Sequence, residues 1–431
     1  MRLIPFTVDI TPPVGHPLAY GLNDKVDTPI YLRGLIFDDR GRRVVLAAAE
    51  IIGFYGGSYY QWRQAIARAT RTPVAQVLLH VVHQHDSLMP PSPELSRMMR
   101  KYPDTEPGEA NVWAGMLAKV VSTLTKAVRS GRWQKVEGVG SAEKRLSGLA
   151  ANRRLLGPNG KVRVMRWSMT TNPELQKEPV GRIDPLLRSI GFFGARGRLL
   201  ATLHFYATHP MGAYGRRMVS SDVPGVALKH LRAASPGATH IYLTGCGADV
   251  TFGKYTTADK KRNLRVLGGR LGAGLVANTL ALRPTAKPAL GVKHVPLALP
   301  IDGKRNSLKN VAKKLAEAKT REAALWPAAK WEVVKHWKKW STTTLTRLDL
   351  SGETHILSLP AETAVEMQLF AQAQVPDRFL ACAAYGNLCY QYLCSQAMFD
   401  EGGYEPSATI CSGKVGARYF AAIENLLADL K

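Results

Sequence analysis

Cysteine is scarce in this sequence, with five residues among 431. Most of them fall in the last fifth of the chain, and the full set is Cys246, Cys382, Cys389, Cys394 and Cys411. An odd number argues against a fully paired secreted framework. A zinc site formed by Cys389, Cys394 and Cys411 is one alternative, but the spacing of these residues matches no compact C-x-x-C pattern. We therefore predict reduced, buried thiols.

Long apolar runs are also absent. No segment approaches the roughly 18 uncharged apolar residues of a transmembrane helix. The N-terminal residues 1–13, MRLIPFTVDITPP, lack the apolar core of a signal peptide. These absences predict a soluble, cytoplasmic protein, with export through a removed leader left open. No internal repeat or low-complexity linker divides the chain, and 45% hydrophobic residues can fill a core, so residues 1–431 are expected to form one domain.

Acidic residues are few: 33 Asp and Glu stand against 58 Lys and Arg, for a formal net charge of +25. Because the basic residues are spread widely, no nucleic-acid partner is expected, although contact with an anionic surface stays open. The densest basic patch, residues 309–340, mixes lysines with alanines and tryptophans and predicts one or two amphipathic helices broken at Pro327. This helical insertion, about residues 303–342, would form a solvated face, a lid or a contact with an acidic partner.

What is present is an alternation of strand-like and helix-like segments. Strands are predicted at residues 31–39, 42–52, 75–85, 199–210 and 239–253. Helices are predicted at residues 58–70 and, after a Pro/Gly-rich start, within residues 103–130. Residues 353–374 predict a strand, a proline turn and a helix that begins near Glu362. This rhythm indicates an α/β or mixed α+β fold, with mixed sheets flanked by helices.

Three histidines, His80, His83 and His85, lie within six positions at the end of a predicted strand. On a regular strand His83 and His85 point to the same face, whereas His80 points to the other face and packs. Imidazole both titrates near neutral pH and binds metals, so the pair indicates a metal or proton-transfer site. The alternative is a polar strand end that hydrogen-bonds to a loop.

Other polar residues follow three further predicted strands: His209, the pair Asp249 and Thr251, and Glu362. Loops at strand ends are where open sheets assemble their sites. Two imidazoles and a carboxylate from His83, His209 and Glu362 would suit a catalytic zinc ion. Spacing alone does not establish this set.

Eight motifs, taken in chain order, resemble those of the neutral ceramidase family and cover about 400 positions. They are VDITPPVG (8–15), HVVHQHDS (80–87), NRR (152–154), FYATHPMG (205–212), SSDVPG (220–225), TGCGADVTFG (244–253), LPAE (359–362) and YGNLCYQY with GGYEPSAT (385–392, 402–409). Each motif alone is weak, but eight in family order are specific. The resemblance implies the catalytic domain of a bacterial-type relative, without the immunoglobulin-like C-terminal domain of full-length ceramidases.

The resemblance also implies a zinc ion. Its ligands would be the first histidine of the H-x-H pair, the histidine of the His-Pro motif, the glutamate of the Pro-x-Glu turn and a late tyrosine, which are His83, His209, Glu362 and Tyr392. A shift in alignment would exchange Tyr392 for Tyr390 or Cys389. By the same resemblance His85 lies beside the metal and moves a proton.

Further residues come only from the resemblance. Arg153 matches the arginine of the family's NR motif and Tyr404 the tyrosine of its YE motif, and both would bind substrate or stabilise an oxyanion. Two departures concern the substrate side. Thr251, after Asp249, stands where the family has serine; its hydroxyl can still donate, accept and attack, but the extra methyl group on its Cβ crowds the pocket and limits χ1. Ala19 stands before Tyr20 where the family has glycine. Thr251 is expected to act in catalysis with His85, Arg153 and Tyr404, and Ala19, Tyr20 and Asp249 are expected to bind substrate.

The function expected from the resemblance is zinc-dependent hydrolysis of an amide bond, with a small-molecule or lipid substrate. Ceramide itself is less well supported, although the Trp-rich basic segment is suited to anionic headgroups. An alternative is a metal-dependent enzyme of the same fold that acts on a carbohydrate or another hydroxylated small molecule. A third hypothesis is a basic protein that holds a polyanion without catalysis, which would bind no zinc and would weaken steeply with salt.

Overall fold

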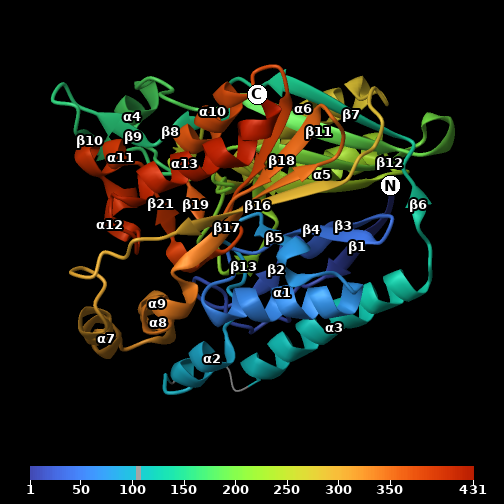
Figure 1. Cartoon of the computed structure of the whole chain (residues 1–431). Helices are drawn as coiled ribbons and strands as arrows, with labels where there is room; N and C mark the ends of the chain where they lie inside the picture. The colour runs from blue at the N-terminus through green and yellow to red at the C-terminus, as the bar shows by residue number, and fades with distance from the viewer. Residues whose placement is uncertain (103–107) are drawn as a thin grey trace.

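The computed structural model describes residues 1–102 and 108–431, and three mixed sheets form its centre (Figure 1). The first sheet contains β1 (Arg2–Asp9), β3 (Tyr31–Asp39), β4 (Arg42–Ala49), β5 (Val77–Val81) and β6 (Gln134–Lys135). The second contains β7 (Gly138–Arg145), β11 (Leu186–Phe193), β12 (Leu199–Tyr206) and β14 (Thr239–Thr244). The third contains β16 (Gly291–Ala298), β17 (Thr342–Asp349), β18 (Thr354–Ser358) and β20 (Phe379–Ala383).

Each sheet combines antiparallel strands with one parallel pair. The parallel pairs are β4/β5, β12/β14 and β18/β20. A helix connects the two strands of each pair: α1 (Gly57–Thr70), α5 (Asp222–Ala234) or α10 (Val365–Gln374). Because parallel strands end at the same edge of a sheet, the loops that follow them gather there. The mixed α+β prediction is confirmed.

The last strands of the three pairs meet at the centre of the molecule. The Val81 amide donates to the carbonyl of Tyr385 (3.1 Å), and the Ala384 amide donates to the carbonyl of Thr244 (2.9 Å). The Thr244 hydroxyl in turn donates to the carbonyl of Val82 (2.7 Å). These bonds tie the ends of β5, β14 and β20 together, so the loops that leave the three sheets face one another.

Short two-stranded ribbons complete the sheets: β2 (Lys25–Val26) with β13 (Met218–Val219), β8 (Ala151–Asn152) with β15 (Val250–Thr251), β9 (Arg154–Leu156) with β10 (Val162–Met165), and β19 (Glu362–Thr363) with β21 (Tyr392–Leu393). The remaining helices outside the insertion are α2 (Pro93–Met99), α3 (Glu109–Arg129), α4 (Pro173–Lys177), α6 (Lys260–Ala281), α11 (Gln396–Glu401), α12 (Tyr404–Ala408) and α13 (Val415–Leu427). Single 3-10 turns are η1 (Val74–Gln76), η2 (Ala195–Gly197), η3 (Leu388–Tyr390) and η4 (Ala428–Leu430). Helices α1 and α3 cover one side of the first sheet (Figure 1).

Several predicted boundaries are wrong by a few residues. The strands predicted to reach residues 52, 85 and 210 end at Ala49, Val81 and Tyr206, because polar loops take over at the sheet edge. The helix predicted near Glu362 begins at Val365, since Glu362 pairs instead within β19. The Pro/Gly-rich start predicted for the long helix falls at residues 103–107, outside the described residues.

The helical insertion (residues 299–341) connects β16 and β17, which pair antiparallel along their full length. It contains α7 (Leu308–Glu317), α8 (Arg321–Lys335) and α9 (Trp337–Trp340). The predicted break at Pro327 is wrong, because Pro327 lies inside α8. The lost backbone hydrogen bond is offset by tertiary packing, since Ala324, Leu325, Ala328 and Val333 of α8 are all buried.

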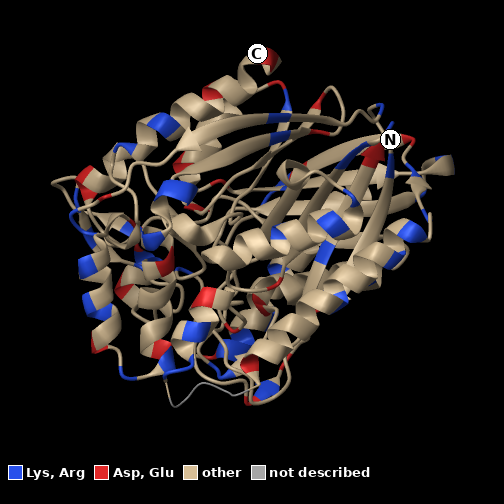
Figure 2. Cartoon of the chain, turned by 60° about the horizontal axis from the view of Figure 1, so that its bottom comes forward, with Lys and Arg blue, Asp and Glu red and all other residues tan. Residues whose placement is uncertain are grey.

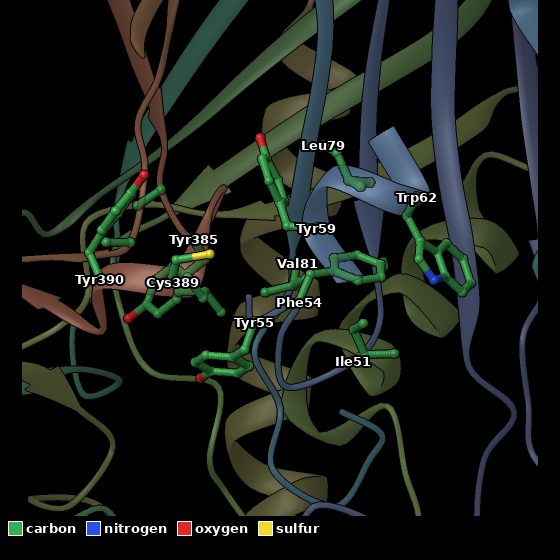
Figure 3. Packing of buried hydrophobic residues seen from close by; sticks show 14 of the residues in the cluster. Ile51, Phe54, Tyr55, Tyr59, Trp62, Leu79, Val81, Tyr385, Cys389 and Tyr390 are labelled. Carbon is green, nitrogen blue, oxygen red and sulfur yellow. The ribbon is translucent and has the colours of Figure 1, made fainter. Parts of the chain in front are cut away.

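Leu325 and Trp340 of the insertion belong to a core cluster rich in aromatic residues, and Figure 3 shows another part of that cluster. Phe54 packs against Trp62 at 5.1 Å between ring centroids, and Tyr385 and Tyr390 are fully buried nearby. All five cysteines are buried and unpaired, as predicted. Within the described residues no helix has the length and apolarity that crossing a membrane requires. Lys and Arg are distributed over the face drawn in Figure 2 rather than gathered in one patch.

Candidate metal centre

The candidate centre begins just after β5. His80 is buried and hydrogen-bonds through both ring nitrogens, so it packs as predicted. The strand ends at Val81, and His83 has a left-handed backbone with φ 74°. Strand alternation therefore does not carry His83 and His85 to one face. The turn itself does so, with ring centroids 5.1 Å apart.

Hydrogen bonds fix the tautomers of two buried histidines. Nδ1 of His83 lies 2.5 Å from the carbonyl oxygen of Ile52, and Nδ1 of His209 lies 2.5 Å from that of Gly247. A carbonyl only accepts, so each Nδ1 carries the proton and each neutral ring presents a lone pair at Nε2. Both Nε2 atoms face Oε2 of Glu362, at 3.4 Å and 3.1 Å. Two lone pairs thus point at a carboxylate.

The electrostatics of this cluster favour a cation between the three groups. Burial lowers the pKa of His209, which disfavours the imidazolium form that would otherwise satisfy Glu362. Burial alone would raise the pKa of Glu362, and this pKa is held well below its ordinary value only by positive charge that faces the carboxylate from the side of His83 and His209. A divalent ion stabilises lone pairs that converge in a buried site, so the two imidazole nitrogens and the carboxylate fit a metal as its ligands.

His85 completes a group of three histidines. One ring nitrogen from each of His83, His85 and His209 lies within 4.8 Å of the others, and within the described residues this is the only cluster of at least three His, Cys, Asp or Glu side chains with such spacing. Nε2 of His85 is buried without a hydrogen-bond partner. Glu362 contacts His83 and His209 directly, which makes His85 the more peripheral imidazole. His85 also stacks on Tyr20, with centroids 5.6 Å apart.

Strand pairing places the predicted tyrosine. Glu362 and Tyr392 are register partners in the parallel ribbon β19/β21. Burial and the Glu362 charge raise the pKa of Tyr392 well above its ordinary value, against a lowering effect of Arg153. The hydroxyl of Tyr390 donates instead to the carbonyl of Trp340 (2.9 Å), and the Cys389 thiol donates to a backbone carbonyl. Tyr392 is therefore the tyrosine beside the carboxylate.

Backbone strain is concentrated here. Four non-glycine residues at or next to the centre have positive φ: His83 (74°), Ala361 (60°), Tyr385 (59°) and Gln391 (57°). Such conformations persist only where the surrounding structure holds them, and they cluster at functional sites. Tyr385 also stacks on the His83 ring at 4.6 Å. Tyr385 was not among the residues predicted for the site, although Tyr385 is the first residue of the YGNLCYQY motif.

Asp86 joins the two histidine-bearing loops. Its carboxylate accepts hydrogen bonds from the Gly215 amide (2.6 Å) and from Nε of Arg216 (2.7 Å). The Asp86 carbonyl accepts from the Ser220 amide (2.9 Å). The loop after His209 is thereby fixed against the loop that carries His83 and His85.

A pocket of about 500 Å³ opens beside the centre. The residues that line it at the strand ends are His83, His85, Glu362, Gln391 and Tyr392. The insertion contributes Val311, Lys314, Trp326, Pro327 and Lys330. The other lining residues are Tyr20, Ile52, Tyr55, Tyr404, Ser407 and Ala408. The predicted residues that line it are His83, His85, Glu362, Tyr392, Tyr20 and Tyr404. The insertion is therefore a wall of the pocket.

Arg153 lies one layer behind the pocket surface. Its Nε donates to Glu405 (2.7 Å), and its guanidinium carbon lies 5.4 Å and 5.6 Å from the ring centroids of Tyr404 and Tyr392. Trp167 closes the other side at 5.5 Å. The buried arginine thus supports two rings that line the pocket.

Two residues predicted to bind substrate, Ala19 and Asp249, and the predicted catalytic Thr251 lie outside the pocket lining. Ala19 is buried and its amide donates to a backbone carbonyl. Asp249 accepts from the Val365 amide (2.9 Å) at the start of α10 and from Nδ2 of Asn152 (2.8 Å). The Thr251 hydroxyl is buried and bonds to backbone groups. All three positions act on the frame of the site.

Comparison with known proteins identifies the fold. No protein-family model matches the sequence, and no curated protein matches it. Neutral ceramidase from Pseudomonas aeruginosa superposes with a TM-score of 0.71 over 100% of this chain and 74% of that chain, at 15% identity. A ceramidase complexed with C2 superposes with a TM-score of 0.68 over 99% of this chain and 75% of that chain, at 13% identity. At such low identity the likeness concerns the fold, and this chain has the neutral ceramidase fold.

Proposed function

We propose that the protein is a zinc-dependent hydrolase that cleaves an amide bond. The observation that carries the proposal is the convergence of Nε2 of His83, Nε2 of His209 and the Glu362 carboxylate on one point between three sheets. Tyr392, paired with Glu362, is the proposed fourth ligand. When bound there, zinc would supply Lewis acidity and an activated water at neutral pH.

The chain's own residues would carry the rest of the reaction. Water adds to the amide carbon, the C–N bond breaks, and the nitrogen leaves with a proton as the amine while the acyl part leaves as the carboxylate. His85 lines the pocket with an unpartnered Nε2, which suits it to pass the proton from the water to the leaving nitrogen. Tyr404 and Tyr20 line the same pocket, and their hydroxyls would orient the substrate.

The proposed substrate is an amphiphilic N-acyl amide. The two structural neighbours named above are ceramidases, and ceramide is an amide-linked lipid. The pocket offers apolar surface from Ile52, Val311 and Trp326 beside its polar groups, and its volume of about 500 Å³ lies in the range of sites for small organic ligands. Turnover of N-acyl lipids measured against N-acetylated sugars separates this substrate from a hydroxylated small molecule.

The test is metal analysis of the purified protein with matched variants. We expect one zinc per chain in the wild type and in His230→Ala, an exposed histidine outside the site. We expect loss of zinc and of amide hydrolysis in His83→Ala and Glu362→Ala. A wild-type protein without stoichiometric metal after zinc loading, or a His83→Ala variant that keeps it, would overturn the proposal.

A further inference from the structure

The insertion wall of the pocket carries positive charge without counter-charge. Lys314 of α7 and Lys330 of α8 both line the pocket. Within the described residues neither lysine has a carboxylate or a hydrogen-bond acceptor as partner. Glu362 is the only carboxylate among the described lining residues, and it faces His83 and His209. The pocket lining therefore combines one carboxylate, which faces two histidines, with two lysines that have no ion partner among the described residues.

Burial makes the charged form of Lys330 unfavourable. Lys330 is half-buried, and burial lowers its pKa to about 8, with further lowering from Arg305 and Lys314. Asp302 acts in the opposite direction, but its carboxylate contacts Nε of Arg305 at 3.4 Å. A half-buried ammonium without an ion partner is unfavourable until an anion reaches it.

The insertion is held in place from its other side. Arg321 of α8 pairs with buried Glu109 (Nη2 to Oε1 2.5 Å). Glu332 accepts from the Ser92 hydroxyl (2.6 Å), and a Cβ atom at Gly56 would come within 2.2 Å of its Oε2. These contacts fix α8, the helix that carries Lys330, against the body of the protein.

On the basis of the proposed function, we propose that the substrate carries an acidic group, a carboxylate, phosphate or sulfonate, which Lys314 and Lys330 bind while the amide lies at the strand-end side. A paired ammonium site of this kind favours a compact anion through two charge-assisted hydrogen bonds. The substrate class is then an N-acyl amide of an acidic small molecule rather than a neutral one.

Binding can be measured without turnover. The probes are monomeric N-decanoylglycine and its neutral counterpart N-decanoylethanolamine, titrated by calorimetry into EDTA-treated protein, so that a carboxylate cannot bind zinc. We expect the acid to bind about tenfold more tightly, and inorganic phosphate to compete with it. The Lys314→Met/Lys330→Met variant should lose the preference. The control Lys309→Met/Lys313→Met removes the same charge from exposed positions of α7 that do not line the pocket, and should keep it.

Three outcomes would overturn the proposal. The first is equal affinity for the two probes in the wild type. The second is an equal loss of preference in both double variants, which would indicate diffuse surface charge. The third is weaker binding to phosphatidylglycerol vesicles in the pocket variant with unchanged binding of the monomeric acid, which would assign the lysines to a lipid surface. Because zinc plays no part in this assay, a failure here is distinct from a failure of the metal proposal.

Discussion

The pocket has two walls of different construction. The strand-end wall includes His83 and Glu362, and Glu362 in turn contacts His209. Both histidines are buried and are hydrogen-bonded to backbone carbonyls of other loops. The insertion wall comes from two helices whose pocket-facing lysines, Lys314 and Lys330, have no ion partner. Under the two proposals made above, the sheet edge holds the metal and the insertion selects the substrate.

The largest effect is expected on the strand-end wall. Glu362→Gln removes the charge that the two imidazoles share, and we expect loss of bound zinc and a fall in hydrolysis of about 10³-fold or more. Metal content and turnover are measured on the same samples. A variant that keeps both would place the metal elsewhere and would break the comparison.

The next effect concerns how the insertion wall is attached. Arg321→Met leaves Glu109 buried without its ion partner, which typically costs about 3–5 kcal/mol of unfolding free energy. Urea unfolding measures the loss, and limited proteolysis should cut within residues 299–341. Lys319→Met, at an exposed neighbouring position, is the control. Zinc content should stay unchanged, and a parallel loss of zinc would show that the two walls are not independent.

A smaller effect distinguishes two roles on the strand-end wall. His85→Ala should keep zinc, because Glu362 contacts only His83 and His209 among the three histidines, and should lower kcat by about 10²- to 10⁴-fold. Kinetics and metal analysis are combined. If zinc is lost as it is in His83→Ala, His85 is a ligand rather than a proton carrier.

The smallest effect is a pH dependence of the insertion wall. The pKa of Lys330 is lowered to about 8 by burial, then by Arg305 and Lys314, against Asp302. Its ammonium is charged below that pH and neutral above it, so affinity for N-decanoylglycine should fall several-fold between pH 7 and pH 9.5. The neutral N-decanoylethanolamine should bind equally at both values. An equal decline for both probes would point to a change in the protein as a whole.

The sequence predicted much of the strand-end wall, because its residues follow strands and sit in ordered motifs. His83 and Glu362 do meet, although the reason given for His83 and His85 was wrong: a positive φ at His83, not strand alternation, brings the two rings together. The strain at Tyr385 depends on contacts between sheets, which no local pattern contains.

The insertion wall was less predictable. The lysine-rich pattern indicated helices, but which lysines face the pocket depends on where α8 is anchored, at Glu109, Ser92 and Gly57. Those contacts join segments far apart in the sequence. The same tertiary packing keeps α8 continuous through Pro327, against its local propensity.

The joining of β5, β14 and β20 at one point has a mechanical consequence. His83, His209 and Glu362 lie on loops that follow strands of three different sheets. An ion bound by all three residues would therefore crosslink the three sheets. Chelation would then lower the melting temperature of all three sheets together rather than loosen a single loop.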